Sequence, residues 1–352
     1  FSQMIESSQV VIDGLVIHHV GSRSEGQPIR FSKSAINLQD NVEVGSLLKT
    51  YFFNAFKNEG YFTFIGAEEG AAGLVYSLAV EVFSDKTKLY NASVRLAEHL
   101  YEHSNHPKIR GGEFYVALFS NVAVDGIGVD ALGIFKSENK DSFLKVYLRG
   151  QDFELGAEEG INIRKLDKGC IIFNTEAEHG FKVVMVDNVN KGNEAAFWKD
   201  DFLGLQPRED AFFYTRNYLD LCKNFVREVY NGENQVPKPE QIDFLNRSID
   251  FFDKKGTFRQ DDFEREVIRL PEVTEAFNDY RNQFETERGI PLNDSFDIAK
   301  TAVKSEKKYF KSVLKLDKNF HVYVHGKRDF IEKGYDDNRG LNYYKLYFEN
   351  EL

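Results

Sequence analysis

Three histidines in the N-terminal half have the residue type and spacing of a metal site. His99 and His103 lie four residues apart at the end of a predicted helix over residues 87–102, so they share one face, as paired zinc ligands can. The sequence has no His-Glu-x-x-His pattern, and the chain leaves the helix at Asn105-His106-Pro107. We therefore interpret the pair as a polar helix end, where protonated His is favoured by the helix dipole.

Other residue types that could do chemistry have simpler structural explanations. Adjacent acidic residues usually point apart, and the pair Asp261-Asp262 falls in a first helical turn, where carboxylates are stabilised. The sequence contains neither a phosphate-binding G-x-x-x-x-G-K-[ST] loop nor a G-x-S-x-G nucleophile elbow. Cys170 and Cys222 lie among apolar neighbours and are expected to be buried and unreactive. We expect no catalytic, cofactor-binding or metal-binding residues, and a protein that is not an enzyme.

The C-terminal segment combines cations with aromatic rings. We predict strands over residues 309–316, 320–325 and 342–348, and if these form one sheet, one face would be basic and aromatic. Such a face suits nucleic acid, since cations bind phosphates and rings stack on bases. A solvated β face with no ligand is the alternative. The candidate nucleic-acid-binding residues are Lys304, Lys307, Lys308, Lys311, Lys315, His321, Tyr323, His325, Lys327, Arg328 and Lys345.

The charge of the chain is unevenly distributed. The whole sequence carries a net charge of −11, which argues against indiscriminate coating of DNA. Between Lys300 and Arg328, however, nine Lys and Arg residues face two acidic residues, a local charge of +7. Residues 1–299 carry −15. The sequence therefore indicates an acidic body with a basic C-terminal segment.

The elements that position these residues indicate an α+β protein with two domains. Residues 1–205 are expected to combine a mixed or antiparallel sheet with helices. An opening strand over residues 10–20 is followed by helical patterns, and short apolar runs separated by Asp-Gly, Lys-Gly and His-Gly steps then predict an antiparallel meander. Residues 29–38 are a weaker candidate strand. Residues 206–352 begin with a strongly amphipathic helix over 211–230, continue with further helices and end in a small basic β unit.

Several stretches resemble the bacterial nucleoid-associated protein family. They are Gly14–Val20, Gly111–Val116, Phe119–Asn121, Val129–Lys136, Phe197–Gly204 with Pro207-Arg208 and Asn217–Leu219, Phe320–Gly326, and Arg339–Phe348. The resemblance covers nearly the whole chain and implies a cytoplasmic protein of the folded chromosome, with no catalytic signature. It supplies no map of DNA-contacting residues, so the candidates above rest on charge and patterning.

Three hypotheses of function follow. The first is a non-enzymatic protein that binds double-stranded DNA through phosphate contacts. The second is an adaptor that reaches DNA only through a partner protein, in keeping with the acidic body and with the aromatic content of 14%. The third, a metal-dependent enzyme, lacks motifs. No apolar run is long enough for a membrane span and no signal peptide is recognisable, so we expect a cytoplasmic, nucleoid-located protein without membrane contact. A homodimer is compatible with the prevalence of two-fold oligomers, and no sequence feature requires it.

Overall fold

The α+β architecture is confirmed in a computed structural model of the chain. The structure describes residues 9–38, 41–56, 60–105, 109–189, 196–310, 313–316, 318, 320–323 and 330–350. Two compact units divide the chain, Phe1–Arg208 and Glu209–Leu352. Each unit has its own apolar core, so each is described by itself.

Unit 1 is built on a seven-stranded antiparallel sheet with the strand order β1-β3-β4-β7-β8-β2-β9. The strands are β1 (Val11–Val20), β2 (Phe62–Phe64), β3 (Gly112–Val124), β4 (Ile127–Ser137), β7 (Lys168–Phe173), β8 (Lys182–Asp187) and β9 (Leu205–Pro207). Asp125 and Gly126 join β3 to β4 with φ values of 49° and 82°. Two positive φ angles give the hairpin turn that matches strand twist, and the Asp-Gly step predicts it.

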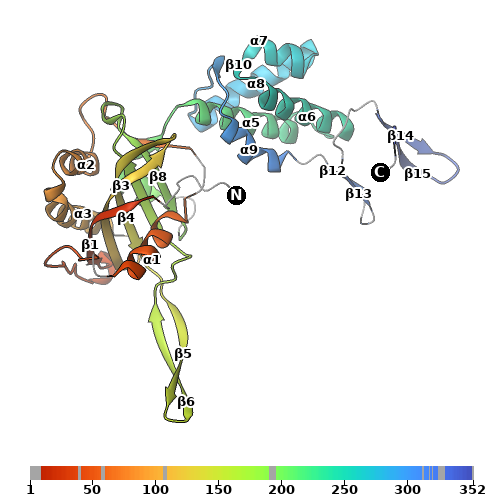
Figure 1. Cartoon of the computed structure of the whole chain (residues 1–352). Coiled ribbons are helices and arrows are strands. Elements are labelled where there is room, and N and C mark those ends of the chain that lie inside the picture. Colours follow the sequence, from red (N-terminus) through yellow and green to blue (C-terminus); the bar gives the residue numbers. More distant parts are fainter. Residues whose placement is uncertain are drawn as a thin grey trace. The chain divides into compact units, whose positions relative to one another are not determined.

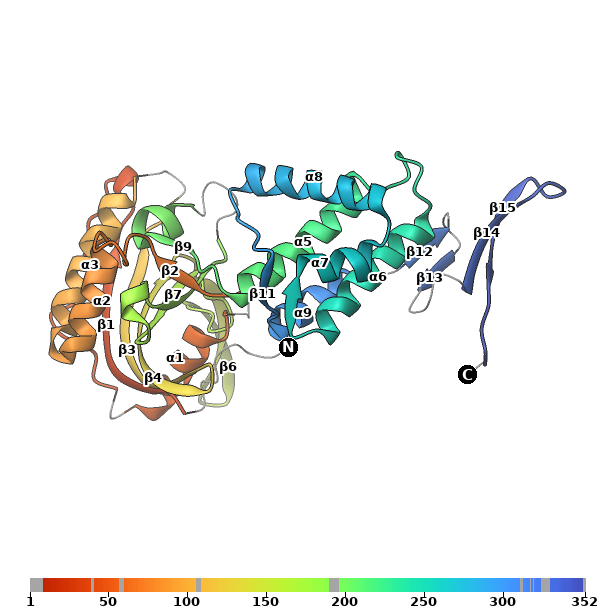
Figure 2. The ribbon, with the colours of Figure 1, turned by 90° about the horizontal axis from the view of Figure 1, so that it is seen from above.

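Helices cover both faces of this sheet (Figures 1 and 2). They are α1 (Val42–Phe53), α2 (Leu74–Ser84) and α3 (Leu89–His103). Alternate residues of β3 point to opposite faces, so Val116 and Leu118 join the core under α2 and α3. Tyr115 and Phe119 join the other core with α1, whose Phe52 also stacks on Phe135 at 4.1 Å between ring centroids. Both faces of the sheet are thus buried.

Residues 29–38, a candidate strand in the sequence, do not form one. Among these residues, only Arg30 makes a β-bridge, to His19. Unit 1 also contains the short 3-10 helices η1 (Arg23–Glu25), which precedes this segment, and η2 (Lys86–Lys88), which lies between α2 and α3. The meander prediction holds for β3, β4, β7 and β8. The connection between β4 and β7 is a separate two-stranded arm, β5 (Asp141–Arg149) and β6 (Asp152–Gly160), which projects from unit 1 (Figure 1).

Unit 2 is mainly helical. Its helices are α5 (Ala211–Glu228), α6 (Lys238–Lys254), α7 (Gln260–Phe263), α8 (Pro271–Arg288) and α9 (Lys300–Glu306). The π-helical turn η5 (Glu264–Ile268) also belongs to unit 2, whereas a second π-helical turn, η4 (Phe197–Leu203), lies in unit 1. Asp210 caps α5 by accepting the Phe213 N–H at 3.0 Å. The core is aromatic, with Tyr218 of α5 at 4.2 Å from Phe258 and 5.3 Å from Phe263 between ring centroids.

The C-terminal β unit differs from the single sheet that we expected. Its strands form two separate hairpins, one of β12 (Val313–Leu316) with β13 (Phe320–Tyr323) and one of β14 (Ile331–Asp336) with β15 (Leu341–Leu346). Unit 2 also contains the 3-10 helix η6 (Lys307–Tyr309) and a strand pair formed by β10 (Thr257–Arg259) and β11 (Ser295–Asp297). The 3-10 helix η3 (Ala177–His179) lies in unit 1. Of the first predicted strand, 309–316, the structure shows residues 313–316 as strand β12, whereas Tyr309 ends the 3-10 helix η6 that follows directly on α9.

Candidate nucleic-acid interface

The basic segment begins with a lysine that has a structural task. Lys300 at the start of α9 points its ammonium group at the end of α6, where Nζ donates to the carbonyl oxygens of Phe252 at 3.0 Å, Asp253 at 2.8 Å and Lys255. The last carbonyls of a helix lack partners within the helix and carry its negative dipole end. Lys300 therefore caps α6 and is not counted toward a nucleic-acid surface.

The other lysines of α9 and η6 differ in how they are used. Lys307 Nζ lies 3.0 Å from Asp253 Oδ2, an exposed ion pair that partly neutralises it. Lys304 and Lys308 are exposed, and Lys308 Nζ lies 4.8 Å from the ring centroid of Tyr309, which is itself 59% exposed. Two cations and one aromatic ring therefore face solvent over six residues.

The β12–β13 hairpin brings two candidate residues to one register position. Lys315 lies directly opposite His321, and Tyr323 at the other end of β13 lies opposite Val313. The alternate residues Leu316 and Val322 pack on Ile242 of α6. Tyr323, on the opposite parity from Val322, is 65% exposed. Phe320, which pairs with Leu316, is 62% exposed, so the face that packs on α6 is only partly covered.

The β14–β15 hairpin also separates its faces, but the charge balance is not the one we expected. Tyr343, Lys345 and Tyr347 share a face, as predicted from alternation. The unexpected strand β14 adds Glu332 to that face, 3.7 Å from Lys345 Nζ, and its carboxylate accepts the Tyr347 O–H at 2.7 Å. Lys345 is therefore partly neutralised.

Four of the candidate residues lie outside the described part of the chain, namely Lys311, His325, Lys327 and Arg328. The strand register places Lys315 opposite His321, whereas Lys304 lies on α9 and Lys308 on η6. Lys345 lies on the other hairpin. Ile331 and Tyr344 of the second hairpin pack on the same Ile242 as Leu316 and Val322 of the first.

The histidines of α3 are engaged by backbone groups. His103 Nδ1 donates to the His99 carbonyl oxygen at 2.8 Å, and His99 Nε2 donates to the Phe202 carbonyl oxygen at 3.1 Å. Burial lowers the pKa of His99. Among the described residues, no group of three or more His, Cys, Asp and Glu side chains is arranged to hold a metal ion, and His106 is outside them. Both cysteines are fully buried thiols.

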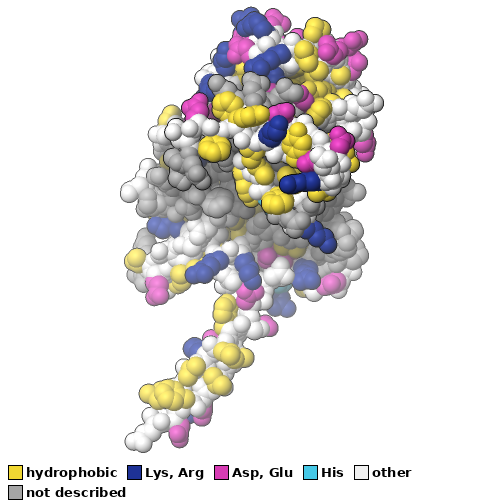
Figure 3. All heavy atoms as spheres, turned by 90° about the vertical axis from the view of Figure 1, so that its right-hand side faces the viewer, with side chains coloured by type: hydrophobic (Ala, Val, Ile, Leu, Met, Phe, Trp, Pro, Cys, Tyr) yellow, Lys and Arg dark blue, Asp and Glu magenta, His cyan; other side chains and the backbone are white. Residues whose placement is uncertain are grey.

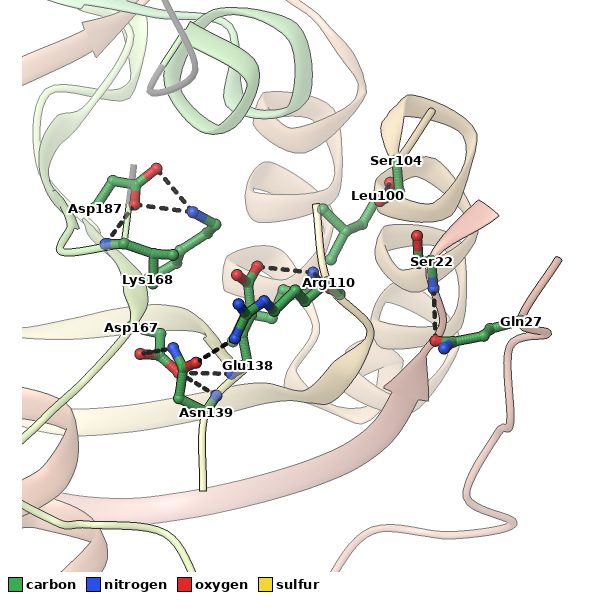
Figure 4. A network of polar contacts seen from close by, with 12 residues as sticks. Ser22, Gln27, Leu100, Ser104, Arg110, Glu138, Asn139, Asp167, Lys168 and Asp187 are labelled. Atoms are coloured by element: carbon green, nitrogen blue, oxygen red, sulfur yellow. Dashed lines mark hydrogen bonds and ion pairs between the residues drawn. The ribbon is translucent and has the colours of Figure 1, made fainter. Parts of the chain in front are cut away.

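A buried ionic network in unit 1 was not foreseen from the sequence (Figure 4). Lys136 of β4 and Lys168 of β7 lie directly opposite each other, and both are fully buried. Lys136 Nζ is 2.9 Å from Glu138 Oε1, and Lys168 Nζ is 2.8 Å from both carboxylate oxygens of Asp187. Burial lowers the pKa of Lys136. Two like charges opposite each other are tolerated only because each has its own carboxylate.

The same network holds the chain that leads into the arm. Asp167 Oδ2 accepts the backbone N–H groups of Glu138 at 2.6 Å and Asn139 at 2.8 Å, and its other oxygen accepts the Asn139 amide at 2.9 Å. Asp167 and Glu138 are buried. These bonds fix the exit of β4, immediately before β5, so the network is a structural clamp at the root of the arm.

A comparison with protein-family models finds a match over residues 16–340 to the family described as nucleoid-associated protein YejK. The chain belongs to this family. The match spans both units of the nucleoid-associated protein, from β1 to the turn before β15, and confirms the resemblance seen in the sequence. No curated protein and no solved structure matches the chain. Among the described helices of this family member, none combines the length and apolar character of a membrane span.

Proposed function

We propose that this nucleoid-associated protein binds double-stranded DNA directly in the nucleoid, through phosphate contacts from the basic segment of unit 2. The observation that carries the proposal is the local charge of +7 between Lys300 and Arg328, in a chain whose remaining part is strongly acidic. Lysine neutralises phosphates and releases their counterions, which drives binding without reading the base sequence. Membership of the family supports an association with the chromosome.

The contacts of the described residues support a smaller set of candidate residues. Lys304 and Lys308 are exposed, and Lys315 shares a register position with His321. Lys300 already donates to carbonyl groups at the end of α6, and Lys307 is already paired with the carboxylate of Asp253. Exposed rings at Tyr309 and Tyr323 accompany the cations and could stack on bases that are unpaired. The acidic remainder repels DNA elsewhere, which restricts binding to one segment.

The test compares two variants that each lose four positive charges. One replaces Lys304, Lys308, Lys311 and Lys315 by Gln. The control replaces Arg227, Lys254, Arg259 and Arg265 by Gln, four exposed cations of unit 2 outside the basic segment. Because both variants have the same net charge, a difference between them reports position. We expect the first to lose affinity for a labelled duplex and the slope of log K against log salt to fall by about 0.9 for each lost contact. Equal affinity of the two variants would remove the segment from the interface.

An adaptor that reaches DNA through a partner protein is the second candidate. It is favoured by the neutralisation of Lys307 by Asp253 and of Lys345 by Glu332, which leaves fewer cations for phosphate. This role predicts that a tagged chain retains protein partners from a lysate treated with nuclease. An empty eluate, compared with an untagged lysate, would argue against it.

A further inference from the structure

The arm formed by β5 and β6 has one face that is apolar over three successive register pairs. The register pairs Leu144 with Ala157, Val146 with Leu155 and Leu148 with Phe153. The large side chains among these six are 61–79% exposed, with Leu144 at 79% and Phe153 and Leu155 at 75%. Figure 3 shows apolar side chains along this projection. Soluble monomers rarely leave such a continuous apolar strip in water.

The opposite face of the arm is satisfied within the arm. Lys145 Nζ lies 3.0 Å from Glu158, which also accepts the Tyr147 O–H at 2.7 Å, and Arg149 lies 3.2 Å from Glu154. The rings of Tyr147 and Phe143 lie over the Cα atoms of Gly156 and Gly160. The polar face therefore has its partners, whereas the described residues cover no part of the apolar face.

We propose that the apolar face of the arm packs against the same face of a second copy of this chain. The one charged residue of this face, Glu159 opposite Ser142, lies at the base of the arm, so no charge opposes self-association over the apolar pairs from Leu144–Ala157 to Leu148–Phe153, and phosphate finds no cation there. The partner must offer an uncharged apolar strip two strands wide that matches residues 144–148 and 153–157, about 17 Å long. A second copy supplies a strip of these dimensions through a two-fold axis.

The distribution of large and small side chains selects the orientation of the two arms. If the arms run in opposite directions, β5 lies over β5 and β6 over β6 of the second copy. Phe153 then lies over the small Ala157 of the second copy, and Leu155 lies over its own counterpart at the axis. If the arms run in the same direction, Phe153 meets Leu148 at the tip and Ala157 meets Leu144 at the base, which packs the layer unevenly. Interdigitation of large with small side chains therefore favours opposite directions.

The first test is the mass of the full chain in solution, measured by sedimentation equilibrium over a wide range of concentration. The wild type is expected to be a dimer and Leu155→Glu a monomer. Ile127→Glu is the matched control, since Ile127 is a strand residue of unit 1 that is 67% exposed and gains the same charge. We expect it to remain dimeric. A monomeric wild type, or a dimer that survives Leu155→Glu, overturns the proposal. Circular dichroism checks that each variant is folded.

The second test fixes the orientation. Packed sheets lie about 10 Å apart, which exceeds the reach of a disulfide, so a short bismaleimide is the appropriate cross-linker. Cys170 and Cys222 are fully buried and do not compete. In the folded chain, Leu155→Cys is expected to link to its own copy, whereas Ile127→Cys is not. Phe153→Cys is expected to link to Ala157→Cys when the two variants are mixed, and much less to itself. Linking of Phe153→Cys mainly to Leu148→Cys would contradict the proposed orientation.

Discussion

Removal of the carboxylate from the buried pair of Lys168 and Asp187 is expected to destabilise unit 1 strongly. In Asp187→Asn, the ammonium group of Lys168 stays fully buried and directly opposite Lys136, with no formal negative charge of its own. Breaking a buried ion pair by removing one partner costs about 3–5 kcal/mol of the free energy of unfolding. An exposed pair costs about 0–1 kcal/mol, so the pair Lys145–Glu158, whose side chains are 54% and 53% exposed, provides the comparison.

The assay is urea unfolding followed by tryptophan fluorescence. Trp198 is the only tryptophan of the chain and is fully buried in unit 1, so its signal reports on that unit. With a urea dependence of about 3 kcal/mol per molar, at the upper end for domains of this size, the midpoint of Asp187→Asn should fall by roughly 1–1.7 M. Glu158→Gln should move it by less than about 0.3 M.

A double variant separates the loss of the pair from the burial of a lone charge. Lys168→Met with Asp187→Leu removes both charges and keeps apolar volume, so most of the lost stability should return. If Asp187→Asn shifts the midpoint no more than Glu158→Gln does, the assignment of a dry, paired lysine in this network is wrong.

Three further predictions concern single residues of the two units. His18 is held neutral, because Nδ1 accepts the Ser32 N–H at 3.1 Å, Nε2 donates to Ser93 Oγ at 2.9 Å and burial lowers its pKa. The stability that the neutral ring contributes is therefore complete above pH 6.5 and is lost as the pH falls further. On acidification, the unfolding midpoint of His18→Gln should drop less than that of the wild type, and an equal drop would contradict this prediction. Asp210→Ala removes the cap of α5 and should lower the stability of unit 2 by about 1 kcal/mol in denaturation followed by circular dichroism, whereas Asp250→Ala, an exposed mid-helix site, should cost less. Cys170 and Cys222 should react with a thiol reagent only after denaturation, since burial raises the pKa of both thiols, that of Cys222 to about 12, and rapid reaction of the native chain would refute their burial.

The sequence predicts those elements whose signals are local. The Asp125-Gly126 step predicts the β3–β4 turn, and the spacing of Leu219, Cys222 and Phe225 predicts the buried face of α5. Strand β6 was missed because its glycines and glutamates have low β propensity, and it forms only by pairing with β5. Strand β14 was missed for the same reason, and with it the acidic partner of Lys345.

The roles of individual lysines depend on contacts between residues far apart in the sequence. Lys300 has the same residue type as Lys304, but three carbonyl groups more than 40 residues earlier fix it as a helix cap. Lys168 sits in an apolar strand, and its partner Asp187 follows 19 residues later. A count of charges along the chain therefore overestimates the cations that can reach a ligand. The buried pairs and the cap can be assigned only from the fold.

The most direct test of the central claim is fluorescence anisotropy of the full chain with a labelled duplex, titrated at several salt concentrations. Direct phosphate contact predicts measurable affinity at low salt and a linear fall of log K with log salt, with a slope of about −0.9 for each contact made. Four to six contacts from the basic segment would give a slope of roughly −4 to −5. Absence of binding at the lowest salt concentration would contradict direct DNA binding and leave the adaptor role as the account of how this family member reaches the chromosome.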